Sequence, residues 1–324
     1  MPVIESSFRP KSLLFRNPHV STIYASLLRL RPRIRFTRER ITLTDTDFLD
    51  LDWSKVRSKK LVIVLSGLEG KSDSLYSRSA VHYFNKQNWD AVCMNYRGCS
   101  GEPNRLLNGY HMGATDDIDQ TVKHILNTCD YTDIILVGYS LGGNLALKYV
   151  GESAETLAPE IKATISYSVP MHIKKSNQRL NKWYNWHYKK WFMIPLNYKA
   201  NRKKRQFPEQ LKNYRGFFMT GDFIYFDTHF TAPANGYKDV EEYWKKSSCI
   251  PHLSKIKVPS LIIDSHDDTF ISDDCYPYAA AEANPCITLE LSDYGGHCGF
   301  ISHITEKESW MEKRAYEFAE ELCG

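Results

Sequence analysis

The segment DIILVGYSLGGNLALKYVG, residues 133–151, decides the fold class of this 324-residue chain. Its first residues form an apolar run typical of a buried strand, and LGGNLALKYVG has the spacing of a helix. Between them lies Gly138-Tyr139-Ser140-Leu141-Gly142, a GxSxG motif. In a strand–turn–helix this motif places a serine hydroxyl on a strained elbow, at the positive end of the helix. The segment therefore predicts Ser140 as a nucleophile; the alternative is a tight turn whose serine only caps the helix.

Further strands and helices extend outward from this segment. Short apolar runs predict strands at 61–65, 90–96, 162–168, 259–264 and 287–291, and helical spacing is found at 75–87, 115–128 and roughly 306–321. Buried strands alternating with helices predict the α/β class, a mostly parallel central sheet with helices on both faces. Residues 33–43 and 47–53 alternate apolar and polar side chains, which predicts two half-exposed antiparallel strands.

The stretch from about residue 170 to 250 interrupts this alternation. It is rich in tryptophan, tyrosine, lysine and arginine, and no part of it has the pattern of a buried strand. We therefore predict one domain spanning 1–324, with a helical lid inserted at about 170–250 between the strand ending near Ser168 and the strand starting near Pro259. Residues 171–215 hold one acid, Glu209, against thirteen bases: Lys174, Lys175, Arg179, Lys182, Lys189, Lys190, Lys199, Arg202, Lys203, Lys204, Arg205, Lys212 and Arg215.

The basic region 174–215 is open to three interpretations. It can be a solvated lid whose lysines keep it soluble, or a surface that contacts anionic lipid, with aromatic side chains at the interface. It can also bind nucleic acid through phosphates. Interleaved bases and aromatics, as in NKWYNWHYKKWF, fit the first two better, and a net charge of only +4 gives no general reason to expect a nucleic-acid partner.

Composition excludes several classes of protein. No run of about 18 apolar residues is present, as a transmembrane helix would need. The first twenty residues do not have the pattern of a signal peptide, so we expect a cytoplasmic location. The eight cysteines form no CxxC pair and are spread over predicted strands and helices, which indicates reduced core thiols. No ligand spacing suggests a metal or organic cofactor, and the sequence makes no prediction of oligomeric state.

A serine nucleophile needs a histidine base that is oriented by a carboxylate. On this type of sheet the chain order is serine, acid, histidine. Of eleven histidines, His297 in YGGHCGF lies on a glycine-flanked loop just after the last predicted strand. The acid is expected after the preceding strand, where LIIDSHDDTF offers Asp267 and Asp268; Asp264 is expected to lie still within the strand. Alternation of side chains does not distinguish Asp267 from Asp268.

An oxyanion formed during acyl transfer needs two backbone donors. One is expected to be the N–H of Leu141, directly after the serine. The other is expected from the loop Ser66-Gly67-Leu68-Glu69-Gly70, where we assign the N–H of Leu68.

Several longer motifs resemble the YheT-like branch of the α/β-hydrolases, also called family four of that superfamily. They run over nearly the whole chain: RNPHVSTI, SGLEG, NYRGCSGEPNR, YHMGATDDI, GYSLGGN, TAPANGY, HDDTF and GGHCGF. The resemblance implies a Ser–Asp–His hydrolase of carboxylic esters, with lipid-like acyl substrates in some relatives. It also implies Asp268 as the acid, since relatives read DDP there and the acid precedes the proline. Here Thr269 replaces that proline, so Asp267 remains an alternative.

Two other positions are notable in this comparison. Ser66 stands where relatives commonly have histidine, which leaves the hydrogen bonding of the oxyanion loop open. Arg97 begins the unusual stretch RGCSGEPNR, and we expect it to tie loops together through a carboxylate such as Glu102.

The expected partner is thus a small-molecule ester or lipid. Two other functions use the same fold: a binding protein without turnover, and an acyltransferase with an alcohol acceptor.

Overall fold

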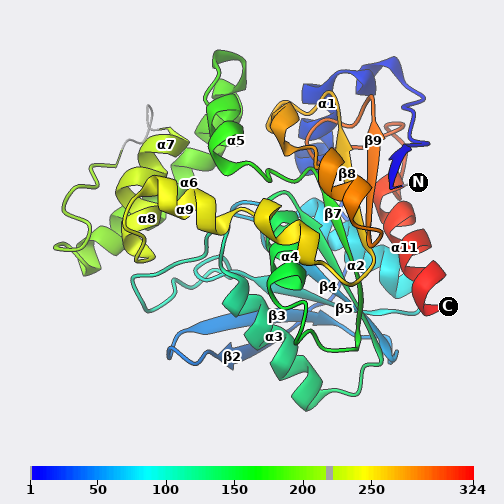
Figure 1. Ribbon diagram of the computed structural model, residues 1–324, viewed down its shortest axis with the longest axis horizontal. Helices are drawn as coiled ribbons and strands as arrows, with labels where there is room; N and C mark the ends of the chain where they lie inside the picture. Colours follow the sequence, from blue (N-terminus) through cyan, green and yellow to red (C-terminus); the bar gives the residue numbers. More distant parts are fainter. Residues whose placement is uncertain (1, 217–221) are drawn as a thin grey trace.

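The computed structural model describes residues 2–216 and 222–324 and is built on one twisted sheet (Figure 1). The described strands follow the order β1-β9-β8-β7-β6-β4-β5-β3-β2. Their bounds are β1 (Val3–Glu5), β2 (Thr37–Thr42), β3 (Phe48–Ser54), β4 (Lys60–Leu65), β5 (Asp90–Asn95), β6 (Asp133–Tyr139), β7 (Ile161–Tyr167), β8 (Ser260–Ser265) and β9 (Ile287–Ser292). Only the pairings of β3 with β2 and with β5 are antiparallel. The predicted, mostly parallel sheet is confirmed.

The sequence did not predict β1, which pairs with the edge strand β9. With three residues it is too short to show a periodic pattern. The expectation that both antiparallel strands are half-exposed was wrong for β3, where Phe48 to Trp53 are all buried. Its carboxylates Asp50 and Asp52 are covered by bidentate hydrogen bonds from Arg40 and Arg38 of β2. Paired in this way, two acidic side chains can occupy the interior.

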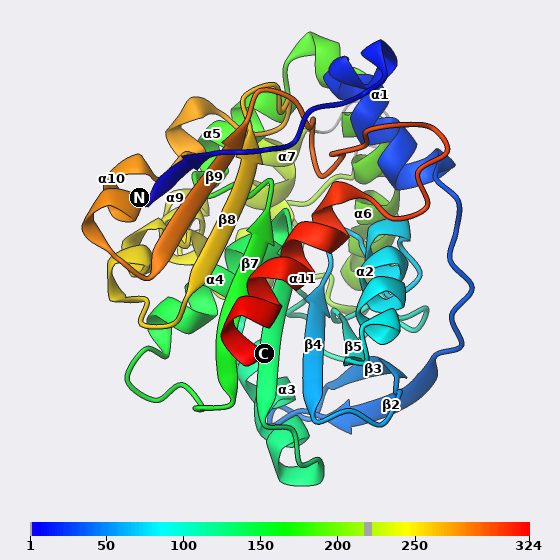
Figure 2. The same ribbon diagram turned by 90° about the vertical axis from the view of Figure 1, so that its right-hand side faces the viewer.

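Helices cover both faces of the sheet. On one face lie α2 (Leu75–Lys86) and α11 (Trp310–Cys323), which contact each other and face the viewer in Figure 2. On the other face lie α3 (Thr115–Thr128), α4 (Leu141–Glu152) and α10 (Tyr278–Ala283). The closing helix α11 starts at Trp310, four residues later than predicted, because Ser309 and Glu312 form a capping box there.

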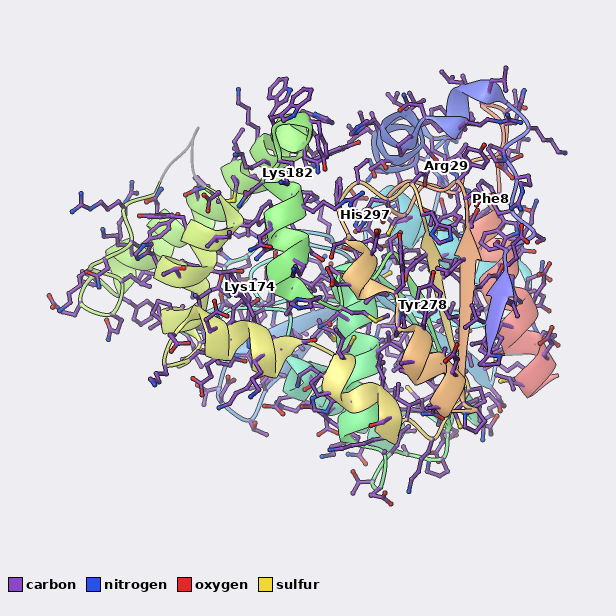
Figure 3. All side chains as sticks on the ribbon, turned by 45° about the horizontal axis from the view of Figure 1, so that its top comes forward. Phe8, Arg29, Lys174, Lys182, Tyr278 and His297 are labelled. Atoms are coloured by element: carbon purple, nitrogen blue, oxygen red, sulfur yellow. The ribbon has the colours of Figure 1, made fainter. Side chains whose placement is uncertain are left out.

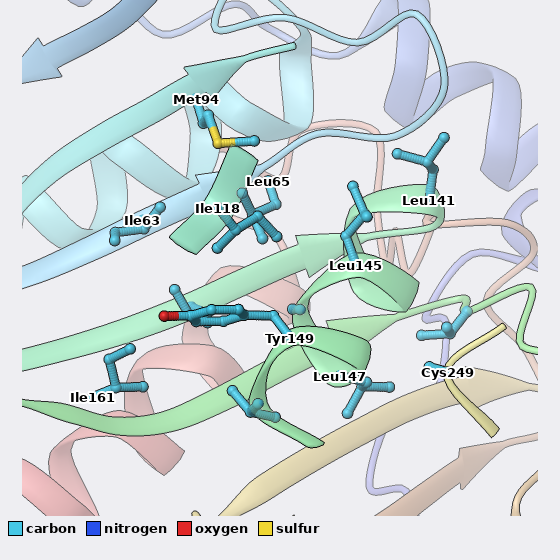
Figure 4. Close-up of a cluster of buried hydrophobic side chains, with 14 of the residues drawn as sticks. Ile63, Leu65, Met94, Ile118, Leu141, Leu145, Leu147, Tyr149, Ile161 and Cys249 are labelled. Atoms are coloured by element: carbon cyan, nitrogen blue, oxygen red, sulfur yellow. The ribbon is translucent and has the colours of Figure 1, made fainter. Parts of the chain in front are cut away.

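The two faces divide the apolar side chains of each central strand. In β4, Leu61, Ile63 and Leu65 pack toward α3 and α4, whereas Val62 and Val64 pack toward α2 and α11. Figure 4 shows the first cluster, where Ile63 and Leu65 lie among residues of α4 and neighbouring strands. Burial on both faces explains why these strands have continuous apolar sequences.

In the described part of the inserted segment, every regular element is helical, and turns connect the helices. It contains α5 (Ile173–Leu180), a 3₁₀ turn at Trp183–Asn185, α6 (Trp186–Gln206), α7 (Phe223–Phe226), a π-helical turn at Asp227–Thr231, α8 (Ala232–Ala234) and α9 (Val240–Ser247). Residues 217–221 of the predicted lid lie outside the described residues. The segment leaves the sheet after β7 and returns before β8, and its role as a lid stays a prediction.

A buried ion pair fastens the N-terminal segment to the body. Both guanidinium Nη atoms of Arg29 donate to the carboxylate of Glu312 on α11, each at 2.8 Å, and both side chains are almost fully buried. We expect Arg29→Leu to lower the free energy of unfolding by about 3–5 kcal/mol, since Glu312 would remain buried without its counter-charge. Urea denaturation would measure this. Arg31→Leu is the control: its pair with Asp73 is exposed, so a change below about 1 kcal/mol is expected. Equal effects would contradict the argument.

Candidate active site

Ser140 lies at the turn between β6 and α4 in a conformation that side chains rarely adopt, with φ 53° and ψ −115°. The flanking glycines allow this turn. A Cβ atom on Gly138 would lie 2.5 Å from the carbonyl oxygen of Gly142, and one on Gly142 would lie 2.2 Å from that of Leu65. The strained elbow expected from the GxSxG motif is therefore present, with Ser140 partly exposed at its tip.

The structure brings Ser140, His297 and Asp268 into one hydrogen-bonded chain. Ser140 Oγ lies 2.9 Å from His297 Nε2, and His297 Nδ1 lies 2.8 Å from Asp268 Oδ2. The other oxygen of Asp268 accepts the backbone N–H of Phe270 at 2.7 Å. Asp268 is completely buried, and the ring of Phe270 stacks on the imidazole at 4.1 Å between centroids. This geometry can transfer the serine proton to an oriented imidazole.

The loop that carries His297 is fixed by two neighbouring segments. The backbone N–H of His297 donates to Thr22 Oγ1, and that of Cys298 donates to Ser168 Oγ, both at 2.9 Å. A Cβ on Gly296 would lie 2.5 Å from the carbonyl oxygen of Pro18. Pro18 and Thr22 belong to α1 (Pro18–Ile23), so the RNPHVSTI motif contacts the backbone of the loop that carries His297. The motif is recognisable in the sequence, but its role in holding this loop is visible only in the fold.

Asp267, the alternative acid, does not contact His297 but holds its loop. Its Oδ1 accepts the backbone N–H of Gly296 at 2.8 Å. Burial raises the pKa of Asp267 above its ordinary value. The structure therefore places Asp268 next to the imidazole and Asp267 one step away.

Asp264 lies within β8, as expected, and is fully buried. One carboxyl oxygen accepts the backbone N–H of Val169 at 2.9 Å, and the other has no hydrogen-bond partner among the described residues. Burial raises the pKa of Asp264 to about 8. Its neutral form is thus the one that the folded state favours.

This carboxyl should make stability depend on pH. Between its ordinary pKa and about 8, the folded state keeps a proton that the unfolded state has lost, so the free energy of unfolding falls as pH rises through that window. Asp264→Asn cannot ionise, and we expect it to become more stable relative to wild type between pH 5 and pH 9. Denaturant titrations at both pH values measure the difference. A parallel loss in both proteins would contradict the assignment.

The loop expected to supply the oxyanion donor is held by three tyrosine hydroxyls. Tyr96 donates to the carbonyl of Ser66 at 2.7 Å, while Tyr76 and Tyr110 accept the N–H groups of Gly67 and Glu69, each at 3.0 Å. The N–H groups of Leu68 and Leu141, by contrast, donate to no other group within residues 2–216 and 222–324. Ser66, which stands where relatives commonly have histidine, forms a hydrogen bond with Ser77: their Oγ atoms lie 3.0 Å apart.

An ion pair that the sequence could not reveal joins this loop to the lid. Lys199 of α6 lies 2.8 Å from Glu69 Oε2, and Tyr110 donates to Glu69 Oε1 at 2.6 Å. Glu69 has a left-handed conformation with φ 58°. Since Glu69 directly follows Leu68, the lid helix is linked to the segment that carries the expected donor.

A cavity of about 430 Å³ opens onto Ser140 and His297 beneath the lid. Leu68, Leu141 and Phe270 line it near the serine. Farther from the serine its wall is largely apolar and comes from the lid: Ile173, Leu180, Leu196, Phe223, Phe226 and Phe230. The size and apolar lining are those of a small-molecule site.

Arg97 ties loops together, as expected, but not through Glu102. Its guanidinium bonds Asp117 at 2.7 Å and Asp45 at 2.6 Å, with Asp47 at 3.5 Å. Glu102 instead pairs with Arg40. The chosen partner was wrong because two acids distant in sequence, Asp45 and Asp117, lie closer than the acid of the same loop.

Comparison with known proteins agrees with this architecture. Residues 60–304 match the family model for the alpha/beta hydrolase fold. The chain is 31% identical to YheT of Escherichia coli (strain K12), provisionally named an esterase, over 93% of this chain and 89% of that protein. It is 24% identical to human "Phospholipase ABHD3" (98% and 79% covered) and 23% identical to human "Monoacylglycerol lipase ABHD2" (99% and 81%).

Among solved structures, the Pyrococcus furiosus esterase Pf2001 superposes with a TM-score of 0.60 at 17% identity, covering 91% of this chain and 99% of that one. At that identity the likeness concerns the fold. The family match and the relatives that span nearly the whole chain carry the assignment further: the chain belongs to the α/β-hydrolase fold family, in its YheT-like branch.

Proposed function

We propose that this protein is a serine hydrolase that cleaves carboxylic esters through an acyl-enzyme on Ser140. The observation that carries the proposal is the hydrogen-bonded chain Ser140–His297–Asp268, which opens onto an apolar cavity. A strained serine, an imidazole and a buried carboxylate have no shared structural purpose in a protein that only binds a ligand.

In the proposed reaction His297 Nε2 takes the proton of Ser140 as the serine oxygen attacks the ester carbonyl. The backbone N–H groups of Leu68 and Leu141 stabilise the resulting oxyanion. The imidazolium then protonates the leaving alcohol, and the acyl group stays on Ser140. Water then cleaves the acyl-enzyme. His297 takes a proton from the water as its oxygen bonds to the carbonyl carbon, and the imidazolium returns that proton to Ser140 Oγ as the bond between Ser140 and the acyl group breaks. Asp268 holds His297 in the tautomer that carries its proton on Nδ1, and it stabilises the imidazolium that forms.

The cavity favours an ester with an apolar acyl group of short or medium length, or an acylglycerol-type lipid. The lid supplies most of the apolar wall, so the acyl chain would lie between Leu141 and the phenylalanines at 223, 226 and 230. The names of the mammalian relatives, a phospholipase and a monoacylglycerol lipase, point to the same substrate class.

A fluorophosphonate probe followed by peptide mapping tests the nucleophile. We expect a single modified residue, Ser140, and hydrolysis of 4-nitrophenyl esters with an optimum at one chain length. Product analysis with added alcohol separates hydrolysis from acyl transfer: free acid alone supports the proposal, and ester product points to the transferase. A folded protein that takes no label and cleaves no ester would overturn the proposal in favour of a binding protein.

A further inference from the structure

Helix α6 has apolar side chains on its outer face as well as on its inner face. The inner face packs Met193, Leu196 and Ala200 into the lid core. The outer face exposes Trp191 and Ile194, Trp186 is exposed at the first residue of the helix, and Trp183 in the preceding turn is 83% exposed. Large apolar side chains gathered on a surface in this way mark an interaction site more often than a solvated one.

A second exposed apolar group lies on the N-terminal segment. Leu13 is 73% exposed, and Leu14, Leu27, Leu28 and Leu30 are also exposed. His19 of α1 joins this segment to the start of α6: its ring stacks on Tyr188 at 5.7 Å, and its Nδ1 lies 3.2 Å from the Tyr188 hydroxyl. Figures 1 and 2 both show α1 and the turn after α5 at the upper end of the molecule. We call the exposed residues 13, 14, 27, 28, 183 and 186, with Lys182 and Lys190, the docking face.

Most of the positive charge in the segment 171–215 is not neutralised by an ion pair. Of the thirteen bases in 171–215, only Lys174 and Lys199 pair with a carboxylate anywhere in the described part of the chain. Lys182 and Lys190 are exposed, and Lys190 lies over the ring of Trp186 at 4.9 Å. The N-terminal segment adds exposed bases of its own that pair with no carboxylate in the described part of the chain: Lys11, Arg16, Arg33 and Arg35.

Tryptophan, leucine and unpaired lysine on one surface fit a bilayer that carries anionic lipid. The indole and leucine side chains enter the boundary between head groups and acyl chains, and the lysines meet the phosphates. Within residues 2–216 and 222–324, no helix has the length and apolarity needed to span a bilayer. From these observations we infer that the docking face seats this protein on the surface of an anionic membrane as a peripheral protein.

Docking would bring the active site close to the lipid. Tyr188, beside His19, packs on Phe270 at 4.6 Å, and Phe270 stacks on His297. Figure 3, viewed from nearer the upper end, shows His297 between Lys182 of the lid and Arg29 of the N-terminal segment. The two segments that carry the docking face thus lie on either side of His297 in this view, although no residue of the docking face lines the cavity.

Vesicle flotation tests this inference independently of the proposed reaction. The probes are phosphatidylcholine vesicles with and without 30% phosphatidylserine, on the order of 100 nm across, at low and high NaCl. The protein carries Ser140→Ala so that no lipid is cleaved. We expect binding to the anionic vesicles at low salt, weakened about tenfold or more at high salt, and little binding to neutral vesicles.

Matched variants separate the two contributions. Lys182→Gln with Lys190→Gln should weaken partition roughly 30-fold, since each lysine near an anionic surface contributes about 1 kcal/mol. Trp183→Ser with Trp186→Ser should weaken it by a similar factor or more, whereas Lys59→Gln with Leu322→Ser, on exposed sites elsewhere, should leave it unchanged.

Several results would overturn the inference. One is failure to bind anionic vesicles at low salt, and another is binding that the tryptophan pair does not weaken. Binding of duplex DNA that depends on the lysines but not on the tryptophans would assign the face to nucleic acid. A dimer in gel filtration that the tryptophan variants dissociate would assign it to a second copy of the chain.

Discussion

Replacing Ser140 with alanine is expected to lower kcat for ester hydrolysis by roughly 10⁶-fold, the loss seen when a serine nucleophile is removed from such a hydrogen-bonded chain. The reason is geometric: Ser140 Oγ is the atom that lies 2.9 Å from His297 Nε2 and faces the cavity. Without it, the imidazole has no nucleophile to activate. Steady-state hydrolysis of the best 4-nitrophenyl ester, read beside fluorophosphonate labelling, measures both effects.

The control for this substitution is Ser254→Ala, which removes a hydroxyl from an exposed site far along the chain from the elbow. It should keep full activity and full labelling. The free energy of unfolding of Ser140→Ala should lie within about 1 kcal/mol of the wild-type value, because alanine fits the same elbow. Labelling that survives in Ser140→Ala would mean that a different side chain is the nucleophile.

The fold was predictable because its signals are local. Continuous apolar runs separated by helical spacing indicate a parallel sheet, and the structure has each predicted strand. The features that the sequence did not predict depend on contacts between different segments of the chain. The strand Val3–Glu5 is recognisable only through its pairing with β9, and the burial of Asp50 and Asp52 depends on arginines of the neighbouring strand. Neither of these contacts leaves a periodic pattern.

The same distinction applies to the site. Ser140 and His297 could be proposed because glycines mark the loops that carry them, whereas chain order gave only the region of the acid, and Asp268 was chosen over Asp267 on the family resemblance. The support around them could not be read from the sequence. Thr22 and Gly296 are 274 residues apart, and the ion pair of Lys199 with Glu69 joins residues that are 130 positions apart. Long-range contacts of this kind decide how the proposed catalytic groups are held.

The two neighbouring acids give the sharpest comparison. Asp268→Asn is expected to lower kcat about 10⁴-fold, because an amide beside His297 Nδ1 favours the wrong tautomer and cannot stabilise the imidazolium. Asp267→Asn keeps an oxygen that can accept the N–H of Gly296, so its effect should stay within about tenfold. The measurement is kcat and KM for one ester on both variants.

Each of the two variants serves as the control for the other, since the substitutions are isosteric, adjacent and equal in charge. A loss confined to kcat in Asp268→Asn, with fluorophosphonate labelling slowed in parallel, would locate the orienting carboxylate at position 268. The buried setting of Asp268 argues for this outcome: its Oδ1 is already occupied by the backbone of Phe270, which leaves Oδ2 for the imidazole alone. If Asp267→Asn proved the more damaging change, rigidity of the His297 loop, and not the charge beside Nδ1, would be the feature that limits the reaction.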